Sequence, residues 1–374
     1  MLPRKKSKPV KDKVKTLGLY LFLLWSLVRA TPVWACDVPV FRWAIERWLP
    51  DPYEVVIFKR GPMIPSHRAT VDELESSAIA NAAVRVVEIN SELDAAMKEL
   101  WDRQPSSRLP RMVVCYPNAP PTAGGFWSGP LTGDTVKALL DSPKRREIAN
   151  RLLDGDSAVW VLLESGDSAK DDPAARLLSE QIERMQETLK LPDRAPDLGY
   201  ATWITPDAPS LPIAFSLVRV SRSDPAEQMF VEMLLHSESD LLSFAEPMAF
   251  PIFGRGRALY ALVGAGITEE NIEEACAFLV GACTCQVKDE NPGTDMLMSV
   301  DWDGSIETQL VAELVPAPFP GLAEAVAGTN VAPTRAYSGF SISVLRNALI
   351  AFALLIMIVA AITFVLVKRK SSAS

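Results

Sequence analysis

Three of the five cysteines lie close together near residue 280, and their spacing suggests reactive thiol chemistry. Cys276, Cys283 and Cys285 fall within a stretch of ten residues. A Cys-x-Cys pair can form a strained, reducible disulfide, or it can supply thiolates to a soft metal ion such as copper(I) or zinc. The cluster therefore points to thiol redox chemistry or to metal handling.

The same cysteines also fit a structural role. Zinc usually takes four ligands, and the two histidines, His67 and His236, lie far away in the sequence. Cys276 and Cys283 would be about 10 Å apart along a straight helix, which exceeds disulfide reach. Cysteine is also one of the residue types most often buried. We therefore interpret Cys276 as a core residue and Cys283 and Cys285 as structural, with thiol or metal handling as the alternative.

Cys36 offers a different chemistry, because residues 33–35 before it resemble a lipoprotein cleavage site. Cleavage there would leave an acylated cysteine at the new N-terminus and add a lipid anchor. Trp34 is bulky for such a site, and residues 29–32 separate it from the preceding apolar run. We favour ordinary signal cleavage near Ala35 and keep lipidation of Cys36 as the alternative.

The chain is apolar at both ends, and cations flank each apolar stretch. Residues 1–15 carry seven lysines and arginines and precede an apolar run at 17–28, which is typical of a secretory signal. Residues 349–367 form a second apolar run, long enough to cross a hydrocarbon core of about 30 Å. The cations at 368–370 favour a cytoplasmic C-terminus. The sequence predicts a single-pass protein of the cell membrane with an extracytoplasmic ectodomain; an uncleaved N-terminal anchor is the alternative.

The region between these ends is strongly acidic. Residues 36–345 hold 26 basic and 45 acidic side chains, a formal charge of −19. Phosphate backbones would repel such a surface, so we exclude nucleic acid as a partner. A region of 310 residues is too long for one ordinary core, which predicts at least two domains. Five cysteines in an oxidising compartment permit at most two internal disulfides.

Alternating strand and helix patterns occur twice in this region. Apolar runs predict strands at residues 53–58, 84–89, 112–116, near 126, 158–163, 213–220, 248–253 and 257–263. Cap signals predict helix starts at Ser142-Pro143, Asp172-Pro173, Asp224-Pro225 and Thr268. Gly254-Arg255-Gly256 predicts the tip of a hairpin. A further strand is predicted at 296–302.

Each half therefore has the order strand, helix, strand, helix, proline, hairpin, helix, with Pro110 and Pro247 at the same point. This order resembles a thioredoxin-like fold written twice, over residues 53–155 and 156–283. The resemblance implies the α/β fold class, with two thioredoxin-like domains in tandem and a C-terminal transmembrane helix. It also implies that Pro110 and Pro247 follow cis peptide bonds and face the loop between the first strand and first helix.

Thioredoxin-type catalysis uses a Cys-x-x-Cys pair at the start of the first helix, where the helix end lowers the thiol pKa. The matching positions are 59–62 in the first half and 166–169 in the second, and neither has a cysteine. This departure removes the redox chemistry of the family and leaves a binding or scaffolding role. Residues 36–41 resemble the corresponding segment of uncharacterised bacterial membrane proteins. This resemblance does not point to any particular activity.

These observations predict a non-enzymatic accessory or scaffold subunit of a bacterial envelope complex. Its partners would be proteins, and we expect no cofactor and no catalytic residue. The predicted organisation is a signal peptide (1–35), two thioredoxin-like domains (36–155 and 156–285), an extension (286–315), a proline-rich spacer (316–344), a transmembrane helix (345–367) and a cytoplasmic tail (368–374).

Overall fold

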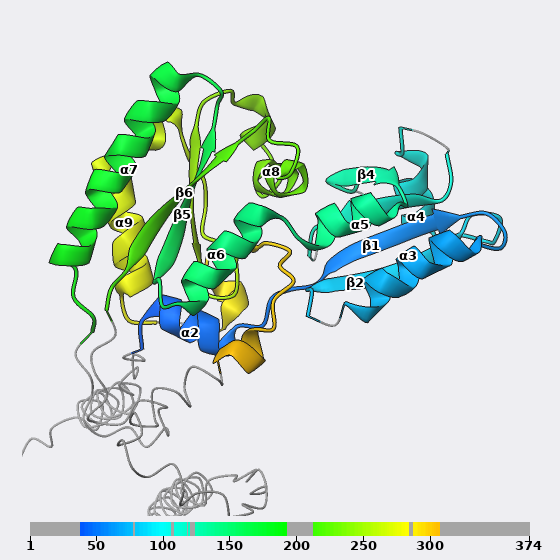
Figure 1. Cartoon of the computed structure of the whole chain (residues 1–374), viewed down its shortest axis with the longest axis horizontal. Helices are drawn as coiled ribbons and strands as arrows, with labels where there is room; N and C mark the ends of the chain where they lie inside the picture. Colours follow the sequence, from blue (N-terminus) through cyan, green and yellow to red (C-terminus); the bar gives the residue numbers. More distant parts are fainter. Residues whose placement is uncertain are drawn as a thin grey trace, which may run out of the picture. The chain divides into compact units, whose positions relative to one another are not determined.

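The computed structural model describes residues 38–77, 79–105, 108–117, 119, 124–192, 212–283 and 287–306. All of them belong to one compact unit, and they form two β-sheets covered by helices (Figure 1). This arrangement confirms the predicted α/β class. In this part of the chain, no helix combines the length and apolar character needed to cross a membrane. The predicted signal, spacer, transmembrane and tail segments lie outside the described residues.

The elements follow the chain in the order of their labels in Figure 1. The strands are β1 (Tyr53–Lys59), β2 (Ala82–Glu88), β3 (Arg111–Cys115), β4 (Trp127–Pro130), β5 (Ala158–Glu164), β6 (Phe215–Ser221), β7 (Met248–Phe253), β8 (Arg257–Ala258), β9 (Leu262–Val263) and β10 (Thr294–Asp295). The α-helices are α2 (Val40–Arg47), α3 (Pro65–Ser76), α4 (Ala95–Asp102), α5 (Gly133–Leu140), α6 (Pro143–Leu153), α7 (Ser168–Thr188), α8 (Gln228–Leu235) and α9 (Glu269–Val280).

The first sheet has the strand order β2-β1-β3-β4. β2 runs parallel to β1, whereas β1 and β3, and β3 and β4, pair antiparallel. Apolar side chains of α3 and α5 pack on one face of this sheet, and those of α4 pack on the other. We call this sheet with α3, α4 and α5 the first lobe.

The second sheet has the order β10-β8-β7-β5-β6, with β9 also paired to β7. β6 is parallel to β5, while β7 is antiparallel to β5 and β8 antiparallel to β7. Read from β6 to β8, the order and directions are those of the first sheet. Helices α2, α7 and α9 pack on one face, and α6 and α8 pack on the other. We call this sheet and its helices the second lobe.

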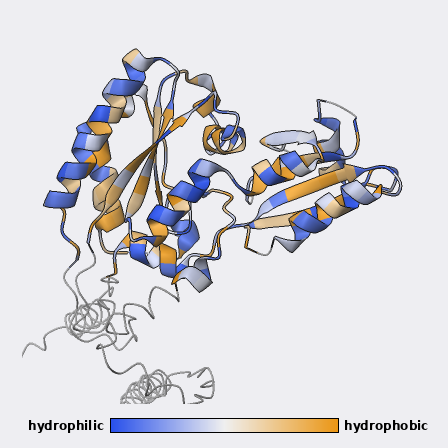
Figure 2. Cartoon of the chain, in the orientation of Figure 1, coloured by the Kyte–Doolittle hydropathy of each residue, from blue (hydrophilic) through white to orange (hydrophobic). Residues whose placement is uncertain are grey.

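The central strands form where the sequence has continuous apolar runs. The runs at 53–58, 158–163 and 248–253 become β1, β5 and β7, in which nearly every residue is buried. Strands covered on both faces read as continuous rather than alternating apolar runs. Figure 2 shows this as apolar strands between helices that each have one polar side.

Two of the four predicted helix starts are confirmed and two are wrong. Ser142 and Thr268 cap α6 and α9 as expected. Asp172-Pro173 lies inside α7, because the Asp167 side chain caps that helix earlier by accepting from Ala169 N at 3.0 Å. Asp224 accepts from Glu227 N at 3.1 Å and closes a turn, so α8 begins only at Gln228.

Two helices that the predicted boundaries place in the first domain pack on the second sheet. α2 lies against β7 and α9: Val40 N donates to Gly281 O at 3.0 Å, and Arg255 Nε donates to Ile45 O at 2.8 Å. α6 lies against β5 and β6. The second lobe therefore includes helices from both sides of residue 155.

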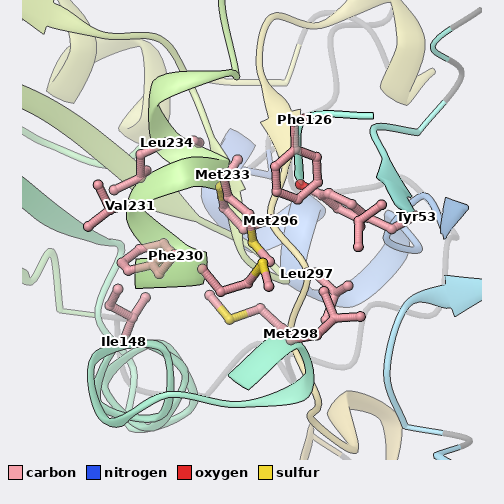
Figure 3. Packing of buried hydrophobic residues seen from close by; sticks show 14 of the residues in the cluster. Tyr53, Phe126, Ile148, Phe230, Val231, Met233, Leu234, Met296, Leu297 and Met298 are labelled. Atoms are coloured by element: carbon pink, nitrogen blue, oxygen red, sulfur yellow. The ribbon is translucent and has the colours of Figure 1, made fainter. Parts of the chain in front are cut away.

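One apolar cluster includes buried residues of both lobes. It joins Tyr53 and Phe126 of the first lobe to Phe230 and Met233 of the second (Figure 3). The Tyr116 hydroxyl also donates across it to the carbonyl oxygen of Met233. The two sheets are thus separate, but their cores are continuous.

Candidate functional site

The loop between β1 and α3 is where the resemblance expects the first cysteine pair. Residues 59–62, like 166–169, include no thiol. Glu88 fixes this loop, because its Oε2 accepts from Lys59 Nζ at 2.9 Å and from Gly61 N at 2.8 Å. The hydrogen bond from Lys59 lowers the pKa of Glu88 below its ordinary value. The loop is therefore held by an ion pair and presents no thiol.

The loop between β5 and α7 is organised by a buried carboxylate. Asp171 Oδ1 accepts from the backbone N and the Oγ of Ser165, each at 2.8 Å, and Oδ2 accepts from Gly166 N at 3.0 Å. A serine hydroxyl becomes a nucleophile when an imidazole takes its proton. The ring Nδ1 of His236 instead lies 2.9 Å from the carbonyl oxygen of Glu232. Ser165 therefore has a structural role.

Pro110 and Pro247, the two prolines expected at equivalent positions, differ in the peptide bond that precedes them. The Leu109–Pro110 peptide bond is cis, and it is the single cis bond among the described residues. The expectation of a cis bond before Pro247 is therefore wrong. An X-Pro peptide bond favours the trans form by about 0.5–1 kcal/mol. The Glu246 carbonyl oxygen before Pro247 accepts from Arg222 Nη2 at 2.7 Å.

Two of the candidate thiols lie in the core of the second lobe. Cys276 and Cys283 are buried in the same apolar cluster of the second lobe. Burial raises the pKa of the Cys276 thiol to about 12 and that of Cys115 to about 11. Because the thiolate is the nucleophile and metal ligand, neither is poised to react at neutral pH. Cys36 and Cys285 lie outside the described residues.

A metal centre also finds no support there. Among the described residues, no group of three or more His, Cys, Asp or Glu side chains could hold an ion. Cys276 and Cys283 are 0 % and 1 % exposed.

A polar pocket that the sequence did not predict lies at the junction of distant segments. It has a volume of about 320 Å³. Its lining residues are Asp51, Pro117, Arg257, Asp289, Asn291, Gly293, Thr294 and Asp295. Gly293 has a φ of 116°, and a Cβ there would lie 2.6 Å from the Ala258 carbonyl oxygen. The one local sequence signal is the polar run at 288–295, which contains this glycine.

Two of the lining residues are buried and charged. The side chains of Arg257 and Asp295 are 8 % and 4 % exposed, and Arg257 Nη1 lies 3.0 Å from Asp295 Oδ1. Lys288 Nζ lies 2.6 Å from Asp295 Oδ2 and 2.8 Å from Asp51 Oδ1. Asp51 N donates to Asp295 Oδ2 at 2.7 Å. Each buried charge is thus paired, as a low-dielectric site requires.

The lining of the pocket is polar. No cysteine or histidine is among its lining residues. The carboxylates of Asp51 and Asp289 give it an excess of hydrogen-bond acceptors. It is therefore suited to a ligand that donates hydrogen bonds, such as an amine or a polyol.

Exposed apolar side chains lie near two of the sites considered above. Leu242 and Phe244, before Pro247, are 58 % and 39 % exposed, and Ile64, after the β1–α3 loop, is 55 % exposed. Arg222 Nη1 fixes the segment that contains Leu242 and Phe244 by donating to Phe244 O at 3.1 Å.

Comparisons with protein-family models, curated proteins and solved structures found no match to this chain.

Proposed function

We propose that this chain is a membrane-anchored, extracytoplasmic binding or scaffold protein of a bacterial envelope complex. Its ectodomain would consist of two thioredoxin-like domains without the catalytic cysteine pair. The shared strand order of the two sheets supports this fold proposal. So does the distribution of helices, with the first and third helix of each half on one sheet face and the second on the other.

The observation that carries the functional proposal is the chemistry of the two strand-to-helix loops. Glu88 and Asp171 fill them with hydrogen bonds to backbone and side chains, at the place where the family has reactive sulfur. The described thiols lie elsewhere and are buried. A fold that keeps the loops but not the nucleophile retains a surface suited to recognition.

We infer that the exposed apolar side chains supply the protein contacts. Ile64 follows the first loop, and Leu242 and Phe244 precede Pro247. A contiguous exposed apolar patch rimmed by polar residues marks a protein interaction site, and we propose that these side chains belong to such patches. The membrane anchor rests on the apolar run at 345–367 and the signal at 1–35.

Site-specific photo-cross-linking in intact cells tests this proposal. A photoreactive residue would replace Arg60 in the first loop or Asp167 in the second, both of which are exposed. Glu180, exposed on α7, is the matched control position. We expect a discrete cross-linked partner from at least one loop and none from Glu180. Uncross-linked chain alone at both loops, with normal protein levels, would contradict a binding role for these loops.

A further inference from the structure

Residues 294–302, which we call the strap, leave the second sheet and run between the two lobes. The strap begins as β10, which pairs with β8 over two residues. Asp295 is held by Arg257, and Met296 N donates to Gly256 O at 2.9 Å. The start of the strap is thereby fixed to the second lobe.

The first lobe holds the strap mainly through Asn81. The Asn81 Nδ2 donates to Met296 O at 3.2 Å, and its Oδ1 accepts from Met298 N at 2.8 Å. Further along, Val300 N donates to Ile79 O at 3.2 Å. A side-chain amide thus takes the place that a neighbouring strand would have in a sheet.

The end of α5 and the start of α6 also contact the strap. Arg145 Nη1, on a side chain that is almost fully buried, donates to Leu297 O at 2.9 Å. Ser299 Oγ donates to Leu140 O at 2.7 Å. The strap is therefore held largely by side chains and by the carbonyls at the end of a helix, not by a continuous ladder.

The apolar side chains of the strap fill the cluster between the lobes. Met296, Leu297 and Met298 are buried there with Met233 and Phe230 (Figure 3). The cluster is rich in methionine, whose unbranched side chain tolerates rearrangement of its neighbours. Its buried methionines are Met112, Met229, Met233, Met248, Met296 and Met298.

Each lobe keeps its own sheet and a second core without the strap. The ladders among β1, β2, β3 and β4, and among β5, β6 and β7, involve no strap residue. The α4 face of the first lobe and the α7–α9 face of the second have apolar clusters of their own. Loss of the strap would therefore remove contacts between the lobes and leave the sheets paired.

We propose that the strap is a releasable latch. The strap detaches as a unit before either sheet unfolds. Its release lets the two lobes separate at the methionine-rich apolar cluster between them. Such an opening is a sub-global event with a free energy between local fraying and complete unfolding.

Native-state hydrogen exchange on the full chain in detergent micelles tests this proposal. We expect the amides of Met296, Met298 and Val300 to exchange at least about tenfold faster than the central-strand amides of Val56 and Val161. Asn81→Ala removes two strap contacts and should speed strap exchange by a further factor of about ten. Asn150→Ala, at an exposed position of α6, is the matched control and should change neither group.

Methionine oxidation measures the separation of the lobes independently. Dilute peroxide followed by peptide mass spectrometry should oxidise Met233, Met296 and Met298 before Met185, which is equally buried on the far face of the second lobe. If Asn81→Ala fails to fold, Ser299→Ala replaces it, because it removes the strap hydrogen bond to Leu140 O. Equal exchange of strap and central-strand amides, or equal oxidation of the four methionines, would overturn the latch.

Discussion

Arg145 Nη1 donates a hydrogen bond of 2.9 Å to the carbonyl oxygen of Leu297, which lies 152 residues further along the chain. The same guanidinium donates to Leu139 O at 2.8 Å and to Ala138 O at 2.6 Å, at the end of α5. Burial lowers the pKa of Arg145 to about 10, so the side chain remains charged at neutral pH. One buried cation therefore joins the end of a first-lobe helix, the first turn of α6 and the strap.

Replacing Arg145 should destabilise the whole described unit. In Arg145→Met, the carbonyls of Ala138, Leu139 and Leu297 lose a donor inside the protein, which should lower the free energy of unfolding by about 2–4 kcal/mol. Arg146→Met is the control, because Arg146 is exposed and its ion pair with Asp141 should contribute less than about 1 kcal/mol. Urea unfolding followed by circular dichroism measures both. An equal effect of the two changes would count against the joining role of Arg145.

The buried ion pair of the pocket should matter far more than a surface pair. Asp295→Asn leaves Arg257 and Lys288 without their shared carboxylate, and we expect a loss of about 3 kcal/mol in the free energy of unfolding. Asp102→Asn breaks a surface ion pair in which the side chains of Lys98 and Asp102 are 65 % and 54 % exposed. This change should lower the free energy of unfolding by less than about 0.5 kcal/mol. Thermal and urea unfolding of the two variants decide the comparison. A neutral Asp295→Asn variant would contradict it.

The buried thiols should be unreactive in the folded protein. With pKa values raised to about 12 and about 11, Cys276 and Cys115 stay protonated at pH 8, and an aromatic disulfide reagent should modify them only after denaturant is added. A raised pKa gives stability that is complete below the unfolded value of about 8.5 and is lost as the pH rises through the folded value. Fast native labelling of Cys276, or about one bound copper or zinc ion per chain, would instead favour thiol or metal handling.

Acid should loosen the β1–α3 loop before it unfolds the protein. The folded pKa of Glu88 is lowered, so its hydrogen bonds to Lys59 and Gly61 are complete above its ordinary value of about 4.3 and are lost as the pH falls through the folded value. The amide signal of Gly61 in NMR spectra should therefore shift only below that ordinary value. Glu88→Gln should abolish this titration, and Glu92→Gln, at an exposed position, should leave it unchanged.

The N-terminal segment and the end of α9 predict a disulfide. Pro39 forms an antiparallel bridge with Ala282, and Cys283 N donates to Val38 O at 2.9 Å. The sequence has a cysteine three residues before Pro39 and another three residues after Ala282, and we predict that these two, Cys36 and Cys285, which lie outside the described residues, form a disulfide. Directly opposed positions of antiparallel chains lie about 4.5–5.5 Å apart, within disulfide range.

Peptide mapping of the exported protein without reduction measures this pairing. We expect a linked peptide pair containing Cys36 and Cys285, while peptides with Cys115 and Cys276 remain reduced. An acylated Cys36 would favour the lipoprotein alternative, and unlinked thiols at both positions would contradict the register.

The element order could be predicted because it rests on local patterns. The apolar runs that become β1, β5 and β7 have the short length and the β-branched or aromatic residues of buried strands. Ser142 and Thr268 lie one residue before a helix and have the side chain that a cap needs. The hairpin at Gly254–Gly256 follows from two glycines, both with positive φ. In each case the decisive contact lies within a few residues of the signal.

The contacts that organise the sites could not be predicted, because their partners are distant in sequence. Residues 296–302 alternate weakly and suggested a strand, but Asn81 and Arg145 take the hydrogen bonds that a ladder would have used. Asp295 reads as an ordinary turn residue until the fold brings Arg257 and Lys288 to it. No local pattern marks such pairs.

In the exported protein that we propose, the backbone contact between Val38 and Cys283 would constrain the order of folding. A chain that crosses a membrane N-terminus first presents residues 38–40 long before residues 281–283. Residues 38–40 would therefore lack their partner in this contact until almost all of the chain up to residue 283 has crossed. Signal cleavage near Ala35, as the sequence predicts, would have that interval in which to occur.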